Sequence, residues 1–527
     1  MLAALEWTTT RVWGDLAYPL PGLDEAAYYL YFQMPERLNP LFVLEAEQTG
    51  DEEPTFITRP GVNTEEFYLV REQRFPARRA ADGLRIAGLG GSSVQGWPFT
   101  EPGTSFIELV GDQLEDRGGI GRVDVINAGV GSYNTFQIVD VAHQVAVFDP
   151  DVVVLYAGHN DQGYYLFHKT FLDSVLREQG RGTSTVMRVL NRSNAVQGLR
   201  RLRDRGRVSS DPQRHGLTTH SPDDVFMQRE SYVDFLGEEK YLEFLELEGE
   251  YLARFFERNL RDIVGTLRDK DTKVILVVPG ANLRDWPPTL SLHYDSITPT
   301  RAEEIDVALQ RIRSAMDDAG VGPRPLRPIE QSGNDAHWNA GTWLKPGGSP
   351  SLAVGDDRAV AACRGFLHEL DALAEEAPRY SMTHFLLGSC LLHSDPESAL
   401  VALRRARDLA PALPPWQRAT SAMLEVVHAV GADLGIPVVD LPSELGARAD
   451  AGVPGGEFFV DNIHLSPVGA QVVAEIIADA IRDLELKPRR APDPAASVTQ
   501  AAVIENARNP RWGMDLHMPG AGDYQGE

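Results

Sequence analysis

The stretch Gly90-Gly91-Ser92-Ser93-Val94-Gln95-Gly96 decides how the chain is expected to fold. It follows the apolar run 84–89, which predicts a short buried strand. Ser105 and Glu108 then stand at the spacing of a capping box and predict the start of a helix. A hydroxyl group on a glycine turn therefore lies at the carboxyl end of a strand, where reactive groups gather in open parallel sheets. These features make Ser92 a candidate nucleophile.

Short apolar runs recur along the chain and alternate with helical patterns. The expected strands are Leu84–Leu89, Val123–Asn127, Val152–Tyr156, Val274–Val278 and Ile436–Leu441. Such alternation predicts right-handed crossovers and a parallel sheet that helices cover on both faces. The sequence thus indicates an α/β fold in which the carboxyl ends of five strands share one edge.

The composition limits what the chain can bind. Its 527 residues are 43% apolar and 24% charged, which suits a protein of several folding units with a large core. The net charge of -26 argues against a nucleic-acid partner, because phosphate binding needs a basic face. No basic leader and no run of about 18 apolar residues is present. We therefore expect no signal peptide, no transmembrane segment and a cytoplasmic location.

The chain is expected to divide into five segments. Residues 1–80 form an N-terminal arm or cap with little regular structure, 81–295 the first part of the core with an Arg-rich insertion at 166–240, 296–430 a helical insertion, 431–487 the last part of the core, and 488–527 a C-terminal tail. The run 385–411 resembles one tetratricopeptide unit. A single unit cannot form a solenoid, so we expect a helical hairpin packed on the core, with a protein-binding surface as the alternative.

Four separated pieces of sequence are expected to meet at the carboxyl edge of the sheet. They are Ser92, the glycine-rich turn 127–133, the run Gly158-His159-Asn160-Asp161 and the run Asp461-Asn462-Ile463-His464. Glycines allow a tight turn that points backbone amides at a ligand. The side-chain amide of Asn160 can donate a hydrogen bond to a developing oxyanion.

The fourth piece carries the candidate general base. His464 stands just before a helix that Ser466 and Pro467 are expected to open, since Ser is a favoured cap and Pro suits the first helical position. The apolar stripe 468–480 is expected to bury that helix. Asp461 is near enough in sequence to orient the His464 ring. A serine, a histidine and a carboxylate in these roles carry out acyl transfer through a serine ester.

Together the pieces resemble the sequence blocks of the SGNH (GDSL-type) hydrolases, in the same order. The resemblance implies a three-layer, flavodoxin-like core with a central parallel five-stranded sheet, here with an α-helical, tetratricopeptide-like insertion of the kind found in bacterial members. It makes Ser92 the nucleophile, although Gly91 stands where the commonest motif has Asp. It makes His464 the base and Asp461 its partner. The oxyanion donors it implies are Ser92, Gly131 or Ser132, and Asn160.

The resemblance implies a serine esterase that needs no cofactor and no metal. The expected substrate is a small-molecule or carbohydrate ester with a short, acetyl-like acyl group. We expect Trp97, Tyr133 and His159, which neighbour the motifs, to line its binding site. An acyltransferase that uses the same residues is one alternative, and a catalytically weak binding module that uses the helical insertion is the other. The motifs of dinucleotide-binding domains and of the α/β-hydrolase elbow do not fit.

Overall fold

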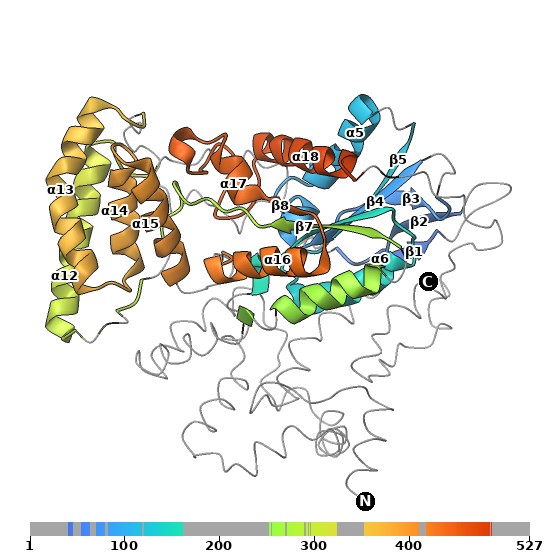
Figure 1. The fold of residues 1–527 in the computed structure, drawn as a ribbon, viewed down its shortest axis with the longest axis horizontal. Helices are drawn as coiled ribbons and strands as arrows, with labels where there is room; N and C mark the ends of the chain where they lie inside the picture. The colour runs from blue at the N-terminus through green and yellow to red at the C-terminus, as the bar shows by residue number, and fades with distance from the viewer. Residues whose placement is uncertain are drawn as a thin grey trace, which may run out of the picture.

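The computed structural model comprises an α/β core, a small N-terminal sheet and a helical unit (Figure 1). It describes residues 40–45, 54–63, 70–79, 83–118, 121–161, 252–253, 256–268, 271–288, 291–293, 295, 297–323, 353–410, 418–484 and 486. The predicted Arg-rich insertion and C-terminal tail lie outside these residues. Within them, no helix combines the length and the apolar character needed to cross a membrane.

Five parallel strands form the central sheet, as the sequence predicts. In spatial order they are β5 (Val123–Gly129), β4 (Leu84–Gly90), β6 (Val152–Tyr156), β7 (Lys273–Val278) and β8 (Val438–Asp440). The last strand is shorter than predicted for a physical reason at each end. Ile436 donates its amide to the Gly431 carbonyl in the end of the preceding helix, and the Asp440 side chain caps the helix that follows.

Helices cover both faces of the sheet, which makes three layers (Figure 1). One face packs against α6 (Thr135–Ala146), the helical stretch 256–268 and α16 (Ser421–Leu434), and the other against α5 (Phe106–Gly118), α17 (Leu441–Gly446) and α18 (Pro467–Arg482). Side chains of one strand alternate between two apolar cores, because successive residues of a strand point to opposite faces. Ala87 and Leu89 thus join the first core, and Ile86 joins the second.

Both predicted helix starts are confirmed. The Ser105 hydroxyl accepts from the Glu108 amide at 3.4 Å, and the Glu108 carboxylate accepts from the Ser105 amide at 3.2 Å. The Ser466 hydroxyl accepts from the Gly469 amide at 3.0 Å at the start of α18. In the predicted apolar stripe of α18, Val473, Ile476 and Ile477 are buried, Val472 and Ala480 are half-buried, and Val468 in the first turn is 61% exposed.

A three-stranded antiparallel sheet, which the sequence does not signal, forms within the N-terminal segment. Its strands are β1 (Phe42–Leu44), β2 (Thr55–Thr58) and β3 (Arg74–Pro76). Phe42, Phe56 and Phe75, one from each strand, surround the ring of Phe148 from the core with centroids 4.9–5.8 Å away. The segment is therefore fixed to the core by an aromatic cluster, which edge-to-face contacts stabilise.

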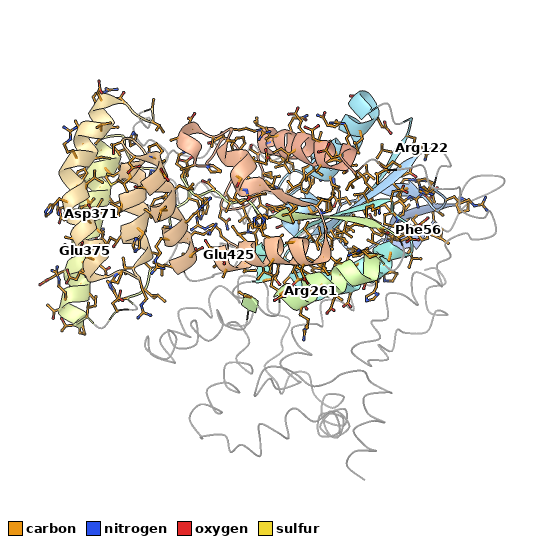
Figure 2. All side chains as sticks on the ribbon, viewed as in Figure 1. Phe56, Arg122, Arg261, Asp371, Glu375 and Glu425 are labelled. Atoms are coloured by element: carbon orange, nitrogen blue, oxygen red, sulfur yellow. The ribbon has the colours of Figure 1, made fainter. Side chains whose placement is uncertain are left out.

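The helical insertion contains a unit with its own apolar core. Its helices are α12 (Pro299–Asp318), α13 (Asp357–Glu376), α14 (Ser381–Leu391) and α15 (Pro396–Leu409). Figure 2 labels Asp371 and Glu375 on α13, in the part of this unit that lies far from the α/β core. Helices α14 and α15 pack as a hairpin, with the Asp395 side chain capping α15 and Gly388 facing Leu403 so closely that a Cβ there would lie 2.6 Å from it.

The whole of helix α16 belongs to the α/β core, whereas the boundary expected at residue 430 places its residues 421–430 in the helical insertion. Its residues Met423, Val427 and Val430 are buried in the same core as β7, and the helical unit ends before it. A parallel connection between β7 and β8 needs a helix that packs on the sheet, and α16 is that helix. A short apolar helix next to a helical insertion carries no local signal that assigns it to one or the other.

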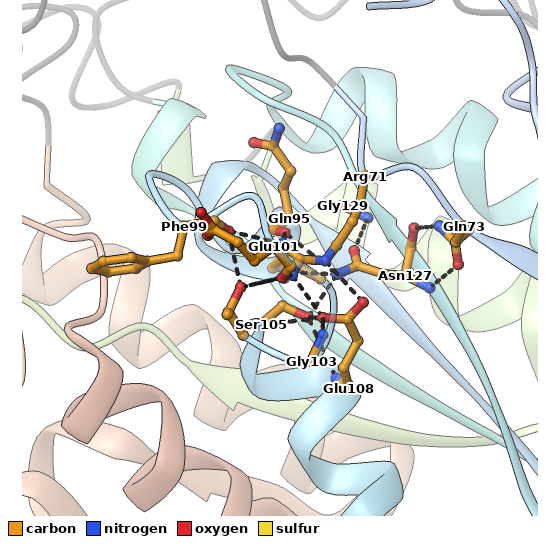
Figure 3. A network of polar contacts seen from close by, with 12 residues as sticks. Arg71, Gln73, Gln95, Phe99, Glu101, Gly103, Ser105, Glu108, Asn127 and Gly129 are labelled. Atoms are coloured by element: carbon orange, nitrogen blue, oxygen red, sulfur yellow. Dashed lines mark hydrogen bonds and ion pairs between the residues drawn. The ribbon is translucent and has the colours of Figure 1, made fainter. Parts of the chain in front are cut away.

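Arg71 fixes the N-terminal segment to the turn after β4 (Figure 3). Its guanidinium is buried and donates to the carbonyls of Gln95 at 3.1 Å, Phe99 at 2.9 Å and Glu101. It also forms an ion pair with Glu108 at 2.9 Å. One side chain thus holds the loop that follows the glycine turn and the first turn of α5.

Asp161, at the end of the short 3₁₀ helix η1 (His159–Asp161), fixes the start of α6. Its buried carboxylate accepts from the amide and the hydroxyl of Thr135, and Asn259 donates to that hydroxyl at 3.0 Å. Burial raises the pKa of Asp161 to about 7, although the two Thr135 hydrogen bonds act in the opposite direction.

We expect Arg71→Met to lower the free energy of unfolding by about 3–5 kcal/mol, because it leaves Glu108 and several carbonyls without their partner. Arg74→Met is the matched control, since Arg74 lies on the same segment, is 65% exposed at its side chain and pairs with Glu45 at the surface. Surface pairs contribute roughly 0–1 kcal/mol. Urea unfolding measures both; equal losses in the two variants would contradict the role of Arg71.

The raised pKa of Asp161 predicts a pH dependence of stability. Since the folded protein holds this proton more tightly than the unfolded chain, its contribution is complete below about pH 4 and is lost as the pH rises to about 7. Asp161→Asn, which stays neutral, should therefore gain up to about 4 kcal/mol relative to wild type across that window. Urea unfolding of both proteins from pH 4 to pH 8 tests this, and a difference that is constant with pH would contradict it.

Candidate active site

The candidate nucleophile stands on a turn that only glycine permits. Strand β4 ends at Gly90, where a Cβ would lie 2.1 Å from the Tyr156 carbonyl oxygen of the neighbouring strand. The Gly91 carbonyl accepts from the amides of Val94 and Gln95 at 3.1 Å each, which starts the short helix α4 (Ser92–Gln95). Ser92 is the first residue of this helix and is partly exposed at the carboxyl edge of the sheet.

The structure brings Ser92, His464 and Asp461 into one hydrogen-bonded chain. His464 Nε2 lies 2.6 Å from Ser92 Oγ, and His464 Nδ1 lies 2.5 Å from Asp461 Oδ2. The second carboxylate oxygen of Asp461 accepts from the amides of His464 at 2.7 Å and Ile463 at 2.9 Å. The base, its partner and the hydroxyl are thus aligned in the order that acyl transfer to serine requires.

The charge of Asp461 sets the direction of these hydrogen bonds. Burial by itself would raise the pKa of this carboxyl, but the His464 ring and the two backbone amides outweigh it and lower the pKa. An ionised carboxylate can only accept, so His464 Nδ1 carries the proton and donates to Asp461. In the neutral imidazole with this tautomer, His464 Nε2 carries a lone pair that accepts from the Ser92 hydroxyl. A general base needs such a free lone pair.

Asn160 lies beside the glycine turn. Its Nδ2 donates to the Tyr133 carbonyl at 3.0 Å, and a Cβ on Gly91 would lie 2.6 Å from the same atom. The side-chain amide is therefore next to the backbone of the nucleophile turn. Asn160 itself is buried in η1 directly after β6, as the sequence predicts for a residue that follows a strand.

Gly131 and Ser132, the candidate oxyanion donors of the glycine-rich turn 127–133, lie directly after β5. The Val130 amide on one side donates to the Gly90 carbonyl at 3.0 Å, and the Tyr133 amide on the other donates to the Val130 carbonyl. This joins the turn to the end of β4. Ser132 is exposed and has a φ of 63°, a conformation that glycine adopts more readily.

Two of the three residues predicted to line a substrate site face the protein interior. Tyr133 is 5% exposed, and burial raises the pKa of its hydroxyl far above the ordinary value. His159 is 6% exposed; its Nδ1 accepts from the Ala419 amide at 3.2 Å and its Nε2 lies 3.4 Å from the Tyr156 hydroxyl. Both ring nitrogens of His159 thus have neighbours within the protein, and the one at Nδ1 comes from a distant segment that the sequence does not signal. Trp97 is only half-buried, directly after the nucleophile turn.

The neighbouring hydroxyl, Ser93, has a different environment from Ser92. Ser93 is buried, and its Oγ lies 3.5 Å from the Ile463 carbonyl in the loop that carries His464. It therefore contacts the base loop without contacting the imidazole. Among the residues that the structure describes, no cluster of three or more His, Cys, Asp or Glu side chains has the arrangement of a metal site.

Sequence reasoning missed Asn282, which connects two parts of the site. It lies in the loop after β7, where its amide donates to the Asn462 carbonyl at 2.9 Å and its side chain donates to the Asp461 carbonyl at 3.1 Å. Its position four residues after an apolar strand is a signal of the same kind that identified Asn160. Arg71 was also missed, and no local pattern marks it, because its partners lie 24 to 37 residues away.

Comparison with known proteins identifies the family of this chain. The family model of the GDSL-like lipase/acylhydrolase family matches residues 89–368, which include Ser92 and Asn160 and end before Asp461. No curated protein matches the chain significantly.

Two solved structures with similarity are esterases or lipases by description. The acetyl xylan esterase AlAXEase shares 12% identity, with 76% of this chain and 100% of that chain covered and a TM-score of 0.28. A lipase/acylhydrolase from Enterococcus faecalis shares 14% identity, with 77% and 100% covered and a TM-score of 0.30. The family match spans more than half of the 527 residues. The chain therefore belongs to the GDSL-like lipase/acylhydrolase family and is a hydrolase that acts on ester bonds.

Proposed function

We propose that the protein is a serine esterase that cleaves O-acyl esters through a covalent intermediate on Ser92. The observation that carries this proposal is the chain of hydrogen bonds from Ser92 Oγ through both nitrogens of His464 to Asp461. The lowered pKa of Asp461 supports it, since an ionised partner keeps the imidazole in the reactive tautomer.

In the acylation half, Ser92 Oγ attacks the ester carbonyl carbon and its proton passes to His464 Nε2. The carbonyl π electrons move to the oxygen, which becomes the oxyanion of a tetrahedral intermediate. When the intermediate collapses, the bond to the alcohol oxygen breaks, and His464 returns the proton to the departing alcohol. Asp461 stabilises the imidazolium that exists between these steps.

In the deacylation half, water takes the place of the alcohol. It attacks the acyl carbon of the Ser92 ester while His464 Nε2 accepts its proton. When the second intermediate collapses, the bond to Ser92 Oγ breaks, His464 returns the proton to that oxygen, and the carboxylic acid is released. We assign stabilisation of both oxyanions to the Asn160 side chain with the amides of Ser92 and of Gly131 or Ser132. The position of Asn160 against the glycine turn supports this assignment.

We expect Ser92→Ala and His464→Ala each to reduce kcat on an activated acetyl ester by about 10⁴-fold or more, with little change in melting temperature. Ser93→Ala is the matched control and should keep kcat within about threefold, because the Ser93 hydroxyl faces the base loop. A fluorophosphonate should label wild type and Ser93→Ala but not Ser92→Ala. Turnover and labelling that persist in Ser92→Ala would reassign the nucleophile.

A panel of acetyl, butyryl and longer acyl esters measures which acyl length the enzyme cleaves fastest. The same panel with and without an added alcohol acceptor separates hydrolysis from acyl transfer.

Asn160→Ala should lower kcat by about 10²–10³-fold and leave KM nearly unchanged, because an oxyanion donor acts on the transition state and not on the bound ester. Steady-state kinetics on the same acetyl ester measure both constants, and thermal melting shows that the fold is retained. A change confined to KM would contradict the oxyanion role.

A further inference from the structure

The chain re-enters the α/β core from the helical unit through two buried residues, Arg418 and Ala419. They precede α16 directly and are 6% and 1% exposed. Each makes polar contacts with a different part of the candidate site, although neither lies in a motif that the family resemblance includes. These contacts suggest a role beyond connecting two helices.

Arg418 contacts the loop after β7, which in turn contacts the loop that carries Asp461 and His464. Its Nη1 donates to the Asn282 carbonyl at 3.1 Å and to the Trp286 carbonyl at 3.2 Å. Burial and the nearby Arg407 lower the pKa of Arg418 to about 9, so the guanidinium is still charged at neutral pH. Asn282 in turn donates to the carbonyls of Asp461 and Asn462. The backbone of the Asp461 loop is thus linked to Arg418 through one residue.

Ala419 contacts the residue before the oxyanion asparagine. Its amide donates to His159 Nδ1 at 3.2 Å. Burial lowers the pKa of His159 to about 3, and the positive charge that His464 carries when protonated acts in the same direction, so the ring is neutral and Nδ1 keeps the lone pair that accepts this bond. His159 and Asn160 are consecutive in η1, so a ring fixed by Ala419 fixes the start of the turn that carries the Asn160 amide.

We propose that Arg418 and Ala419 position both halves of the catalytic centre, the Asp461–His464 loop through Asn282 and Asn160 through His159. This inference rests on the proposed function. Arg418 and His159 touch none of the reacting atoms and are therefore positioning residues. Catalysis by preorganised donors is sensitive to displacements of about 1 Å, so the loss of either contact lowers turnover without abolishing binding.

The packing of the helical unit supports the same connection. Leu283 and Val453 are buried in the core of the helical unit, although they belong to the loop after β7 and to the segment before Asp461. The helical unit therefore packs on the two loops that hold the base. Apolar packing fixes the general position of these two loops. The directional hydrogen bonds of Arg418 and Ala419 fix the backbone of the loop after β7 and the orientation of the His159 ring more closely.

The test uses a pair of variants at His159 that differ in whether the side chain can accept a hydrogen bond. His159→Asn can accept from the Ala419 amide through Oδ1, whereas His159→Leu cannot. We expect kcat on an acetyl ester to fall about 10–100-fold in His159→Leu with KM within about twofold, and to stay within about fivefold of wild type in His159→Asn. A merely structural role predicts equal losses in the two variants, or a loss of thermal stability without a change in kcat, and either result would overturn the inference.

A second pair tests the other contact. Arg418→Lys keeps donors for the two carbonyls, and Arg418→Met removes them. The rate of fluorophosphonate labelling at Ser92, which reports nucleophile activation, should fall about tenfold in Arg418→Met and less than threefold in Arg418→Lys. Labelling of wild type is the separate test of the proposed function: a labelled wild type with no difference within either pair rejects only the positioning role. If Arg418→Met does not fold, the His159 pair decides.

Discussion

The hydrogen bond between His464 Nε2 and Ser92 Oγ joins two residues that are 372 positions apart in the chain. Such a bond needs heavy-atom positions fixed to a few tenths of an ångström, and no local element can supply that over so long a separation. The parallel sheet supplies it. Ser92 follows β4 and Asn160 follows β6, so both lie at the carboxyl edge of the sheet. The loop of His464 is held by the start of α18, which follows it directly.

Because the parallel sheet fixes the positions of the site residues, the core can hold a helical unit in the connection between β7 and β8. Loop-closure entropy grows slowly with length, so a long insertion in one crossover costs little as long as the crossover still ends in a helix on the sheet. α16 is that helix, and the chain continues from it into β8. β8 pairs in parallel with β7. The insertion thus changes the surroundings of the base loop without changing the sheet that positions it.

The sequence predicted the parts of the fold whose causes are local. Apolar runs identified all five strands of the parallel sheet, and the cap residues Ser105 and Ser466 marked two helix starts that the structure confirms. The small N-terminal sheet was missed because its strands have only three or four residues and draw their stability from Phe148 far along the chain. Arg71 was missed because its partners lie far from it in the sequence. The contact of the Ala419 amide with the His159 ring was missed as well, since the two residues are 260 positions apart.

Two aspartates show why the site could not be understood from residue types alone. Asp161 and Asp461 are both largely shielded from water, and burial raises the pKa of each. Asp461 has an imidazole and two backbone amides that reverse the shift, whereas Asp161 has only Thr135, so its pKa stays near 7. The carboxyl that faces His464 is therefore the one held ionised.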